Sequence, residues 1–288
     1  MDERSPNILT SLFRGGRLVA HLFYAVLLAI FYPHLHQTKR RRILKTWSRQ
    51  LLDILDIGIR TEGQWTVCGE GGYLVVANHV SWLDIFVLNA IYPARFIAKA
   101  EVRNWPLIGW LCKRSNTIFI ERAMRQDAAS VNLRVSTLLK QGICVGLFPE
   151  GTTTDGKQVG HFHSALIQPA IDAGAMLCPI ALRYQDEAGK QSSTAAFTGD
   201  MTLSQSIWRI LRSPRFDALL VFTPALATAG ENRRVLARAA QQAISQGLQT
   251  NGATRQTVTQ QGASAFPQTM VSSQSAYALL LNPNLADD

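Results

Sequence analysis

The chain has 288 residues, of which 47% are hydrophobic, and a formal net charge of +9. This apolar fraction is sufficient for a folded core and excludes a disordered chain, and no heptad pattern or glycine period indicates a fibrous protein. Residues 1–60 contain ten Lys and Arg against four Asp and Glu, so this first fifth carries +6 of the +9. A basic segment of this kind indicates an anionic partner, either a membrane surface or a nucleic acid.

Residues 18–32 form an apolar run of fifteen residues that only His21 interrupts. As a helix the run would be about 22 Å long, which is short against about 30 Å of bilayer hydrocarbon. Arg14 and Arg17 precede it and the basic cluster 39–42 follows it. Basic residues on both sides favour a helix that dips into the membrane from the cytoplasmic side over one that spans it.

A second, amphipathic helix is expected over residues 43–55, where apolar residues recur every three or four positions after Pro33 has ended the first. The two helices predict a membrane-embedded helical hairpin over residues 1–60. An alternative is that 43–55 packs on the soluble domain, and both can hold for different faces. A cleaved signal peptide is disfavoured, because no small-x-small site follows the apolar run.

Short apolar runs alternate with helix-period segments over residues 61–249, which predicts an α/β domain with a mixed, mostly parallel sheet flanked by helices. Residues 250–288 are rich in Gln, Ser, Thr and Ala, which predicts a mostly disordered polar tail. The expected strands are 65–68, 73–77, 95–98, 117–120, 143–148, 176–182 and 218–222, and the expected helices are 82–91, 127–140, 165–173 and 231–246.

Cysteines give no sign of a metal site, because the four in the chain are far apart and none belongs to a Cys-x-x-Cys pair. We expect them to be small buried hydrophobic residues in a reducing compartment, and we predict no metal. They are Cys68, Cys112, Cys144 and Cys178.

The clearest candidate for chemistry is the pair His79 and Asp84, which directly follows the strand expected at 73–77. Residues five apart on one helix point about 140° apart. The two can meet if His79 lies in a loop and Asp84 in the first helical turn, with Ser81 as the N-cap. The pair then suits a base and the carboxylate that orients it. The alternative is a capping box, with Asp84 supporting the helix start and His79 an ordinary loop residue.

Three further blocks follow other expected strands. Phe148-Pro149-Glu150-Gly151-Thr152 contains a sharp turn at which Gly151 allows a close approach to the backbone. Phe119-Ile120-Glu121-Arg122 ends with a side chain suited to bind phosphate through two hydrogen bonds. Cys178-Pro179-Ile180-Ala181 is a strand interrupted by proline, which predicts a sheet edge or a bulge near a site.

The four blocks together, Asn-His-x4-Asp, Phe-Ile-Glu-Arg, Phe-Pro-Glu-Gly-Thr and x-Pro-Ile-Ala in this order, resemble the glycerolipid acyltransferase family over roughly residues 60–185. Its best-known members are the 1-acyl-glycerol-3-phosphate acyltransferases. The resemblance implies a membrane-bound O-acyltransferase at the cytoplasmic face of the bacterial inner membrane. It would transfer an acyl chain from acyl-CoA or acyl carrier protein to a lysolipid hydroxyl, giving phosphatidic acid, without a cofactor.

The resemblance also implies roles for single residues. His79 would act as general base on the acceptor hydroxyl, and Asp84 would hold its tautomer. The acceptor hydroxyl attacks directly, so no Ser or Cys nucleophile is needed, and the chain has no Gly-x-Ser-x-Gly elbow. The expected substrate-binding residues are Arg122 and Lys99 for phosphate, Glu150 to orient Arg122 or hold a glycerol hydroxyl, Gly151 and Thr152 as donors, and Asn78.

Two positions depart from the family pattern, because many members have Arg where this chain has Thr153 and a basic residue near Phe162, where it has His163. The departures leave the acceptor open between 1-acyl-glycerol-3-phosphate, a lyso-ornithine lipid and glycerol-3-phosphate. A different class of function is a lipid-binding protein without catalysis. Nucleic-acid binding is disfavoured, because the basic cluster lies between two apolar helices and not on an aromatic platform.

Overall fold

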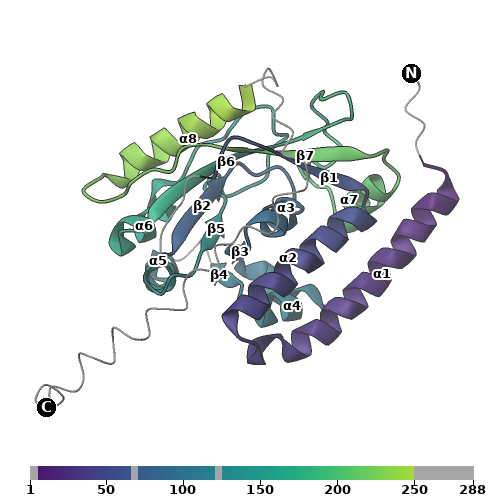
Figure 1. Ribbon diagram of the computed structural model, residues 1–288, viewed down its shortest axis with the longest axis horizontal. Helices are drawn as coiled ribbons and strands as arrows, with labels where there is room; N and C mark the ends of the chain where they lie inside the picture. The colour runs from purple at the N-terminus through teal and green to yellow at the C-terminus, as the bar shows by residue number, and fades with distance from the viewer. Residues whose placement is uncertain (1–5, 66–70, 121–124, 250–288) are drawn as a thin grey trace, which may run out of the picture. The chain divides into compact units, whose positions relative to one another are not determined.

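A computed structural model describes residues 6–65, 71–120 and 125–249 of the chain. Its centre is a seven-stranded sheet with the strand order β1-β7-β6-β2-β5-β3-β4 (Figure 1). All neighbouring strands are parallel except β6 and β7, so the expected α/β fold with a mixed, mostly parallel sheet is confirmed. The strands are β1 Ile57–Glu62, β2 Tyr73–Ala77, β3 Arg95–Lys99, β4 Ile118–Ile120, β5 Val145–Leu147, β6 Met176–Gln185 and β7 Phe216–Phe222.

Helices cover both faces of this sheet, as Figure 1 shows. The α-helices are α1 Ile8–Phe31, α2 Gln37–Ile54, α3 Asp84–Ile91, α4 Ile108–Arg114, α5 Arg125–Lys140, α6 Gln168–Ala173, α7 Leu203–Leu211 and α8 Arg233–Gln249. Short 3₁₀ helices lie at η1 Tyr32–His34, η2 Ala100–Asn104 and η3 Ser164–Leu166. The sequence did not predict α4, α7 or the edge strand β1.

The core has two layers, one on each face of the sheet. Strand β2 contributes to both, because Val75 and Ala77 point into one layer while Leu74 and Val76 point into the other. The first layer lies under α2, α3 and α7, and the second under α5, α6 and α8. A strand buried on both faces has to be apolar along its whole length, which is why residues 73–77 could be recognised as a strand from the sequence.

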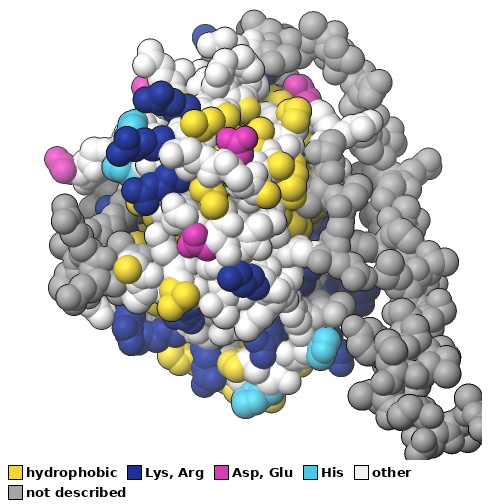
Figure 2. Space-filling view, turned by 90° about the vertical axis from the view of Figure 1, so that its left-hand side faces the viewer, with side chains coloured by type: hydrophobic (Ala, Val, Ile, Leu, Met, Phe, Trp, Pro, Cys, Tyr) yellow, Lys and Arg dark blue, Asp and Glu magenta, His cyan; other side chains and the backbone are white. Residues whose placement is uncertain are grey.

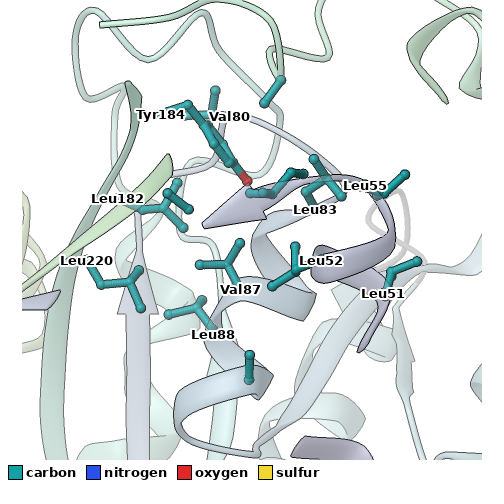
Figure 3. Close-up of a cluster of buried hydrophobic side chains, with 14 of the residues drawn as sticks. Leu51, Leu52, Leu55, Val80, Leu83, Val87, Leu88, Leu182, Tyr184 and Leu220 are labelled. Carbon is teal, nitrogen blue, oxygen red and sulfur yellow. The ribbon is translucent and has the colours of Figure 1, made fainter. Parts of the chain in front are cut away.

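Helix α2 is part of the first layer and shares the core of the domain. Leu51 and Leu52 are 2% and 1% exposed. Figure 3 shows them, with Leu55, beside Val87 and Leu88 of α3. The alternative in which residues 43–55 pack on the domain is therefore confirmed for this face of α2. Residue 60, where the sequence predicted the boundary between hairpin and domain, lies within β1.

Helix α1 is longer than the apolar run from which it was predicted. It begins at Ile8, where the side chain of the N-cap Asn7 accepts a hydrogen bond from Thr10 N (2.9 Å), and its 24 residues extend about 36 Å. Residues 8–34 are long and apolar enough to cross a membrane, and they are the one such segment in the described part of the chain. Its large exposed apolar side chains are Ile8, Leu9, Leu12, Phe13, Val19, Phe23, Tyr24, Leu27, Ile30 and Phe31.

Pro179 does not mark a sheet edge, so the edge half of the prediction is wrong, whereas the pairing beside it is interrupted as at a bulge: Leu177 pairs with Leu226 and Ile180 with Phe222, three steps against four. Strand β6 is central, with β2 on one side and β7 on the other. Pro179 is tolerated because the β6–β7 ladder begins only at Ile180, paired with Phe222, and Thr223 donates to the Pro179 carbonyl from both its backbone N and its hydroxyl. A strand was predicted over residues 65–68, but Trp65 is not part of a strand, and residues 66–68 lie outside the described ranges. The predicted tail, residues 250–288, also lies outside them.

Candidate active site

The carboxyl ends of β2, β5, β3 and β4 meet at one edge of the sheet, because these four neighbouring strands are all parallel. His79 follows β2, Glu150 follows β5, and Lys99 is the last residue of β3. The register places Val76 beside Leu147, so His79 and Glu150 leave the sheet at the same level, three residues further on. Ligand sites of open α/β sheets form at this edge. Arg122 follows β4 but lies outside the described residues.

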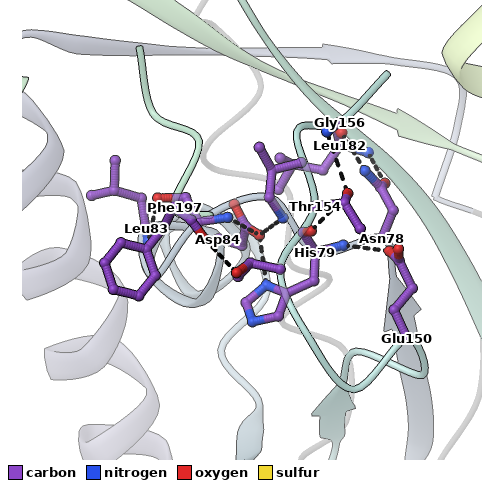
Figure 4. Close-up of polar contacts among 12 residues, drawn as sticks. Asn78, His79, Leu83, Asp84, Glu150, Thr154, Gly156, Leu182 and Phe197 are labelled. Carbon is purple, nitrogen blue, oxygen red and sulfur yellow. Dashed lines mark hydrogen bonds and ion pairs between the residues drawn. The ribbon is translucent and has the colours of Figure 1, made fainter. Parts of the chain in front are cut away.

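His79 and Asp84 meet as the spacing predicted. His79 lies in the loop after β2 and Asp84 is the first residue of α3, and the distance from His79 Nδ1 to Asp84 Oδ2 is 2.8 Å (Figure 4). Asp84 is fully buried, whereas 18% of the His79 side chain is exposed. A carboxylate accepts a hydrogen bond from Nδ1–H, so this contact selects the tautomer with its lone pair on Nε2.

The Asp84 carboxylate accepts three more hydrogen bonds. Oδ2 also accepts from the backbone N of Val80 (2.7 Å) and of Ser81 (2.9 Å), and Oδ1 accepts from the Tyr184 hydroxyl (2.7 Å). These donors fix the carboxylate in both position and rotation. Burial, and then the negative charge of Asp84, raise the pKa of Tyr184, so its hydroxyl stays protonated and remains a donor.

The predicted N-cap at Ser81 is wrong. The N-cap of α3 is Leu83, whose backbone N donates to the Ser81 hydroxyl at 3.3 Å. The bond from Ser81 N to Asp84 nevertheless resembles the side chain-to-backbone half of a capping box, formed two positions before the N-cap. Asp84 therefore both supports the loop before α3 and orients His79, so the two readings of the sequence hold together.

The imidazole of His79 stacks on the ring of Phe148, with a centroid distance of 3.9 Å and an angle of 5° between the planes. Phe148 in turn stacks on Phe96 of β3 at 5.6 Å. One face of the imidazole is thus covered, and Asp84 holds one of its edges. The remaining freedom of the ring is small, which keeps Nε2 in one place.

Glu150 connects two loops. Its Oε1 accepts from the backbone N of His79 and its Oε2 from the backbone N of Gly160, both at 2.8 Å. The side chain is 6% exposed, and burial raises the pKa of its carboxyl above the usual value. The described contacts of Glu150 therefore position His79, and the predicted contact with Arg122 lies outside the described residues.

Asn78 and Gly151 were expected to bind substrate, but the hydrogen bonds described below join them to the protein backbone and give both residues a structural role. The Asn78 amide donates to the Leu182 carbonyl and accepts from Leu182 N, both at 2.8 Å, which ties the start of the loop to β6. Gly151 N donates to the Phe148 carbonyl (3.0 Å) at a φ of +76°, which closes the predicted sharp turn. Thr152 and Lys99 are exposed at the carboxyl edge of the sheet.

The sequence did not reveal several residues that hold the catalytic loop. Thr154 donates to the His79 carbonyl from its backbone N (2.8 Å) and its hydroxyl (3.2 Å), and Phe197 N donates to the Val80 carbonyl (2.9 Å). The Thr153 hydroxyl donates to the Phe197 carbonyl. Tyr184 and Phe197 lie a hundred or more positions from the motif, so no spacing rule could have identified them. Thr154 and Phe148 adjoin the Pro-Glu-Gly turn, and that proximity was the one available signal.

Cysteine is not an alternative nucleophile in the described part of this site. Cys144 and Cys178 are buried, and burial raises the pKa of Cys178 to about 12. Cys112 is only half-buried, less than expected, and burial raises the pKa of its thiol as well. Cys68 lies outside the described residues.

The site and fold agree with known proteins. The acyltransferase family model matches residues 58–183. The chain is 42% identical to the 1-acyl-sn-glycerol-3-phosphate acyltransferase of Neisseria meningitidis serogroup B, over 60% of this chain and 67% of the relative. It is 37% identical to the lyso-ornithine lipid O-acyltransferase of Pseudomonas aeruginosa, over 76% of this chain and 83% of the relative.

A solved structure also shares the fold. The crystal structure of the 1-acyl-sn-glycerophosphate acyltransferase PlsC from Thermotoga maritima matches with a TM-score of 0.65 and 19% sequence identity, over 84% of this chain and 95% of that chain. From the family model, the two relatives and the histidine–aspartate pair at the carboxyl edge of the sheet, we conclude that this chain belongs to the acyltransferase family.

Proposed function

We propose that the protein transfers an acyl chain from a thioester to the free hydroxyl of a lysolipid, with His79 as general base. The observation that carries this proposal is the 2.8 Å contact from His79 Nδ1 to a fully buried Asp84. It commits Nδ1 to the carboxylate and leaves Nε2 as the proton acceptor at a partly exposed position. A general base placed in this way contributes roughly 10²–10⁴ in rate.

The proposed reaction has two stages. His79 Nε2 takes the proton of the acceptor hydroxyl while the oxygen forms a bond to the thioester carbonyl carbon, and the imidazolium that results is stabilised by Asp84. The C–S bond then breaks, and the thiolate leaves and recovers the proton from Nε2. The products are the acylated lipid and the free thiol of the donor. His79 and Asp84 return to their starting state, so the step needs no cofactor.

The proposed acyl donor is acyl-CoA or acyl carrier protein, and the proposed location is the cytoplasmic face of the bacterial inner membrane. The exposed apolar side chains of α1 and the basic residues that follow it support a membrane location. A lysolipid acceptor is itself held in the membrane. A soluble donor would then meet the acceptor at the membrane surface.

We propose 1-acyl-glycerol-3-phosphate as the acceptor, with phosphatidic acid as the product. The Neisseria meningitidis relative is a 1-acyl-sn-glycerol-3-phosphate acyltransferase, and in this chain the acceptor phosphate would be bound by Arg122 and Lys99, which follow or end two adjacent strands. Thr152, exposed beside the Pro-Glu-Gly turn, would add a hydroxyl donor.

A lyso-ornithine lipid is the second candidate, because the chain has Thr153 at a position where the family pattern often has Arg, and the Thr153 hydroxyl donates to the Phe197 carbonyl. The Pseudomonas aeruginosa relative, which this chain matches over 83% of its length, is likewise a lyso-ornithine lipid O-acyltransferase. A lyso-ornithine lipid has no phosphate, so it would need one cation fewer at this site.

A panel of acceptors with one acyl-CoA donor tests the proposal. We expect turnover with lysophosphatidic acid, and loss of about 10²–10⁴-fold for His79→Ala with little change for the exposed His34→Ala. If only lyso-ornithine lipid is acylated, the proposed acceptor is wrong, but the proposed role of His79 stands. Full activity of His79→Ala would overturn the mechanism, and lysolipid binding without donor consumption would indicate a non-catalytic protein.

A further inference from the structure

A basic cavity lies at the edge of the sheet opposite the catalytic edge. It has a volume of about 40 Å³, and its lining includes Arg40 and Arg41 of α2 and Arg95 at the start of β3. No Asp or Glu is among the lining residues. A volume of a few water molecules suits a group the size of a phosphate.

The guanidinium groups of this cavity have no carboxylate partner in the part of the chain that the structure describes. Arg40 donates to the Pro33 carbonyl, but its Nε is buried without a hydrogen-bond partner within those ranges. Burial and the charges of Arg40 and Arg134 lower the pKa of Arg95. Clustered cations that are only partly solvated and lack a counter-ion favour the binding of an anion.

The sequence of α2 is unfavourable for a helix start unless an anion binds there. The N-terminus of a helix favours acidic residues, yet the first turns of α2 have no acidic residue and contain Lys39, Arg40, Arg41 and Arg42. Its N-cap His36 makes no side-chain capping bond. Gln37, the first residue of the helix, also lines the cavity, so the helix terminus and the arginines face the same space.

The cavity lies where a membrane-bound helix would leave the hydrocarbon. Tyr32, which directly follows α1, is part of its lining, and α1 carries the exposed apolar side chains. In Figure 2, basic side chains and histidines lie both at the upper left and on the lower part of the molecule, and the lower group is at the height where Figure 1 places the turn between α1 and α2. Phospholipid headgroups occupy this level of a bilayer.

We propose that the cavity between α2 and β3 binds the phosphate of an anionic membrane phospholipid. Arg40, Arg41 and Arg95 would hold the phosphate oxygens, and the lipid chains would lie along α1. This site is separate from the catalytic edge, because β3 alone extends about 13 Å between Arg95 and Lys99. Lipid binding in this cavity is a function separate from the proposed acyl transfer. If the cavity binds no lipid, the reaction proposed for His79 is unaffected.

Binding to vesicles tests this proposal with the full-length protein. Wild-type protein is titrated with vesicles of phosphatidylcholine and with vesicles in which part of that lipid is replaced by phosphatidylglycerol. We expect Arg95→Gln and Arg40→Gln each to weaken binding to the anionic vesicles about fivefold or more and to leave binding to neutral vesicles unchanged. Arg42→Gln is the matched control, because it removes the same charge from the same turn of α2 at an exposed residue that does not line the cavity.

Three outcomes would overturn the proposal. An equal loss for Arg42→Gln and Arg95→Gln would show attraction by diffuse surface charge and no defined site. Unchanged anionic binding of both cavity variants would show that the arginines do not contact lipid. Saturable binding of inorganic phosphate that removes the preference for anionic vesicles would assign the cavity to a soluble anion. Turnover of a detergent-solubilised acceptor, unchanged in Arg95→Gln, verifies that this variant is folded.

Discussion

Single residues in this site act mainly by holding His79, and its catalytic orientation depends on four partners from two segments, the start of α3 and the loop after β5. Asp84 fixes one edge of the imidazole, Phe148 covers one face, and Glu150 and Thr154 hold the backbone of the same residue. A general base has to lie within hydrogen-bond reach of one proton, so such a restraint contributes to the rate by geometry.

Tyr184→Phe tests the restraint on Asp84 at this scale. Loss of a hydrogen bond to a buried carboxylate should lower the free energy of unfolding by about 1.5–3 kcal/mol. It should also lower kcat/KM by roughly tenfold and move the acid limb of its pH profile to higher pH, because a carboxylate with one donor fewer attracts the imidazole proton more strongly. Unfolding by denaturant and the pH dependence of turnover measure the two effects.

Tyr92→Phe is the matched control, because Tyr92 packs between Trp65 and Phe222 and lies away from Asp84. It should leave the pH profile in place. If Tyr184→Phe lowers stability without changing the shape of the profile, then Tyr184 supports the fold and does not position the base.

At the scale of elements, the sheet joins the catalytic loop to the core through aromatic rings. Phe96 of β3 lies across Gly146 of β5, and its ring stacks on Phe148, which stacks on His79. Gly146 has no side chain, which gives the Phe96 ring room to lie flat across the strand. The positions of β3 and β5 therefore help to fix the position of the His79 imidazole.

Gly146→Ala should disturb this stack. A Cβ at residue 146 would lie 2.6 Å from Cε1 of Phe96, closer than real contacts allow, so the ring has to move toward Phe148. We expect a loss of about 1–3 kcal/mol in the free energy of unfolding together with a fall in kcat. Thermal unfolding and steady-state kinetics measure both.

Gly71→Ala serves as the control, because a Cβ at that position meets nothing within 4 Å, and its effect should stay within about 0.5 kcal/mol. Full activity of Gly146→Ala at reduced stability would show that the aromatic stack is structural only.

At the scale of the molecule, α1 differs from every other helix in the described ranges, since it exposes a long apolar surface while α2 beside it is anchored in the core. Arg14 of α1 forms an ion pair with Asp56 and donates to the Ser213 carbonyl, so the helix is held to the domain by polar contacts. An apolar surface of this size on one element is typical of a membrane-contacting surface.

The double substitution Phe23→Glu and Leu27→Glu should release the protein from membranes. The two side chains are 69% and 60% exposed and lie one turn apart, so their replacement leaves the core intact and removes apolar contact with lipid. We expect the membrane partition coefficient to fall by at least about a hundredfold. Flotation with vesicles measures it.

Leu133→Glu controls for the general effect of an acidic surface residue, because Leu133 is 70% exposed on α5. If the double variant binds vesicles as well as the Leu133→Glu control does, then α1 is not the element that contacts the membrane.

The sequence by itself determined the local features of this protein. Continuous apolar runs identified the buried strands, and for β2 the predicted first and last residues are those of the structure. The spacing of His79 and Asp84 implied their contact, since both lie in one short segment whose geometry depends on a single turn. Residues 43–55 also showed an amphipathic helix, but the pattern could not say what its apolar face would meet, because a membrane and a protein core select the same side chains.

Only the tertiary structure decided which distant groups support the site and where the sheet edges lie. Tyr184, in β6, and Phe197, in a loop, contact the catalytic loop across a hundred or more residues of sequence, and periodicity carries no information on such contacts. The edge strand β1 escaped prediction because it is only partly buried and contains charged residues. Pro179 lies in a central strand because β6 pairs with β2 on one side and β7 on the other, and it is tolerated because the β6–β7 ladder begins one residue later. Strand pairing and burial between segments distant in the sequence thus decided which residues support the site and which strands form the sheet edges, and local propensity contains no information on either.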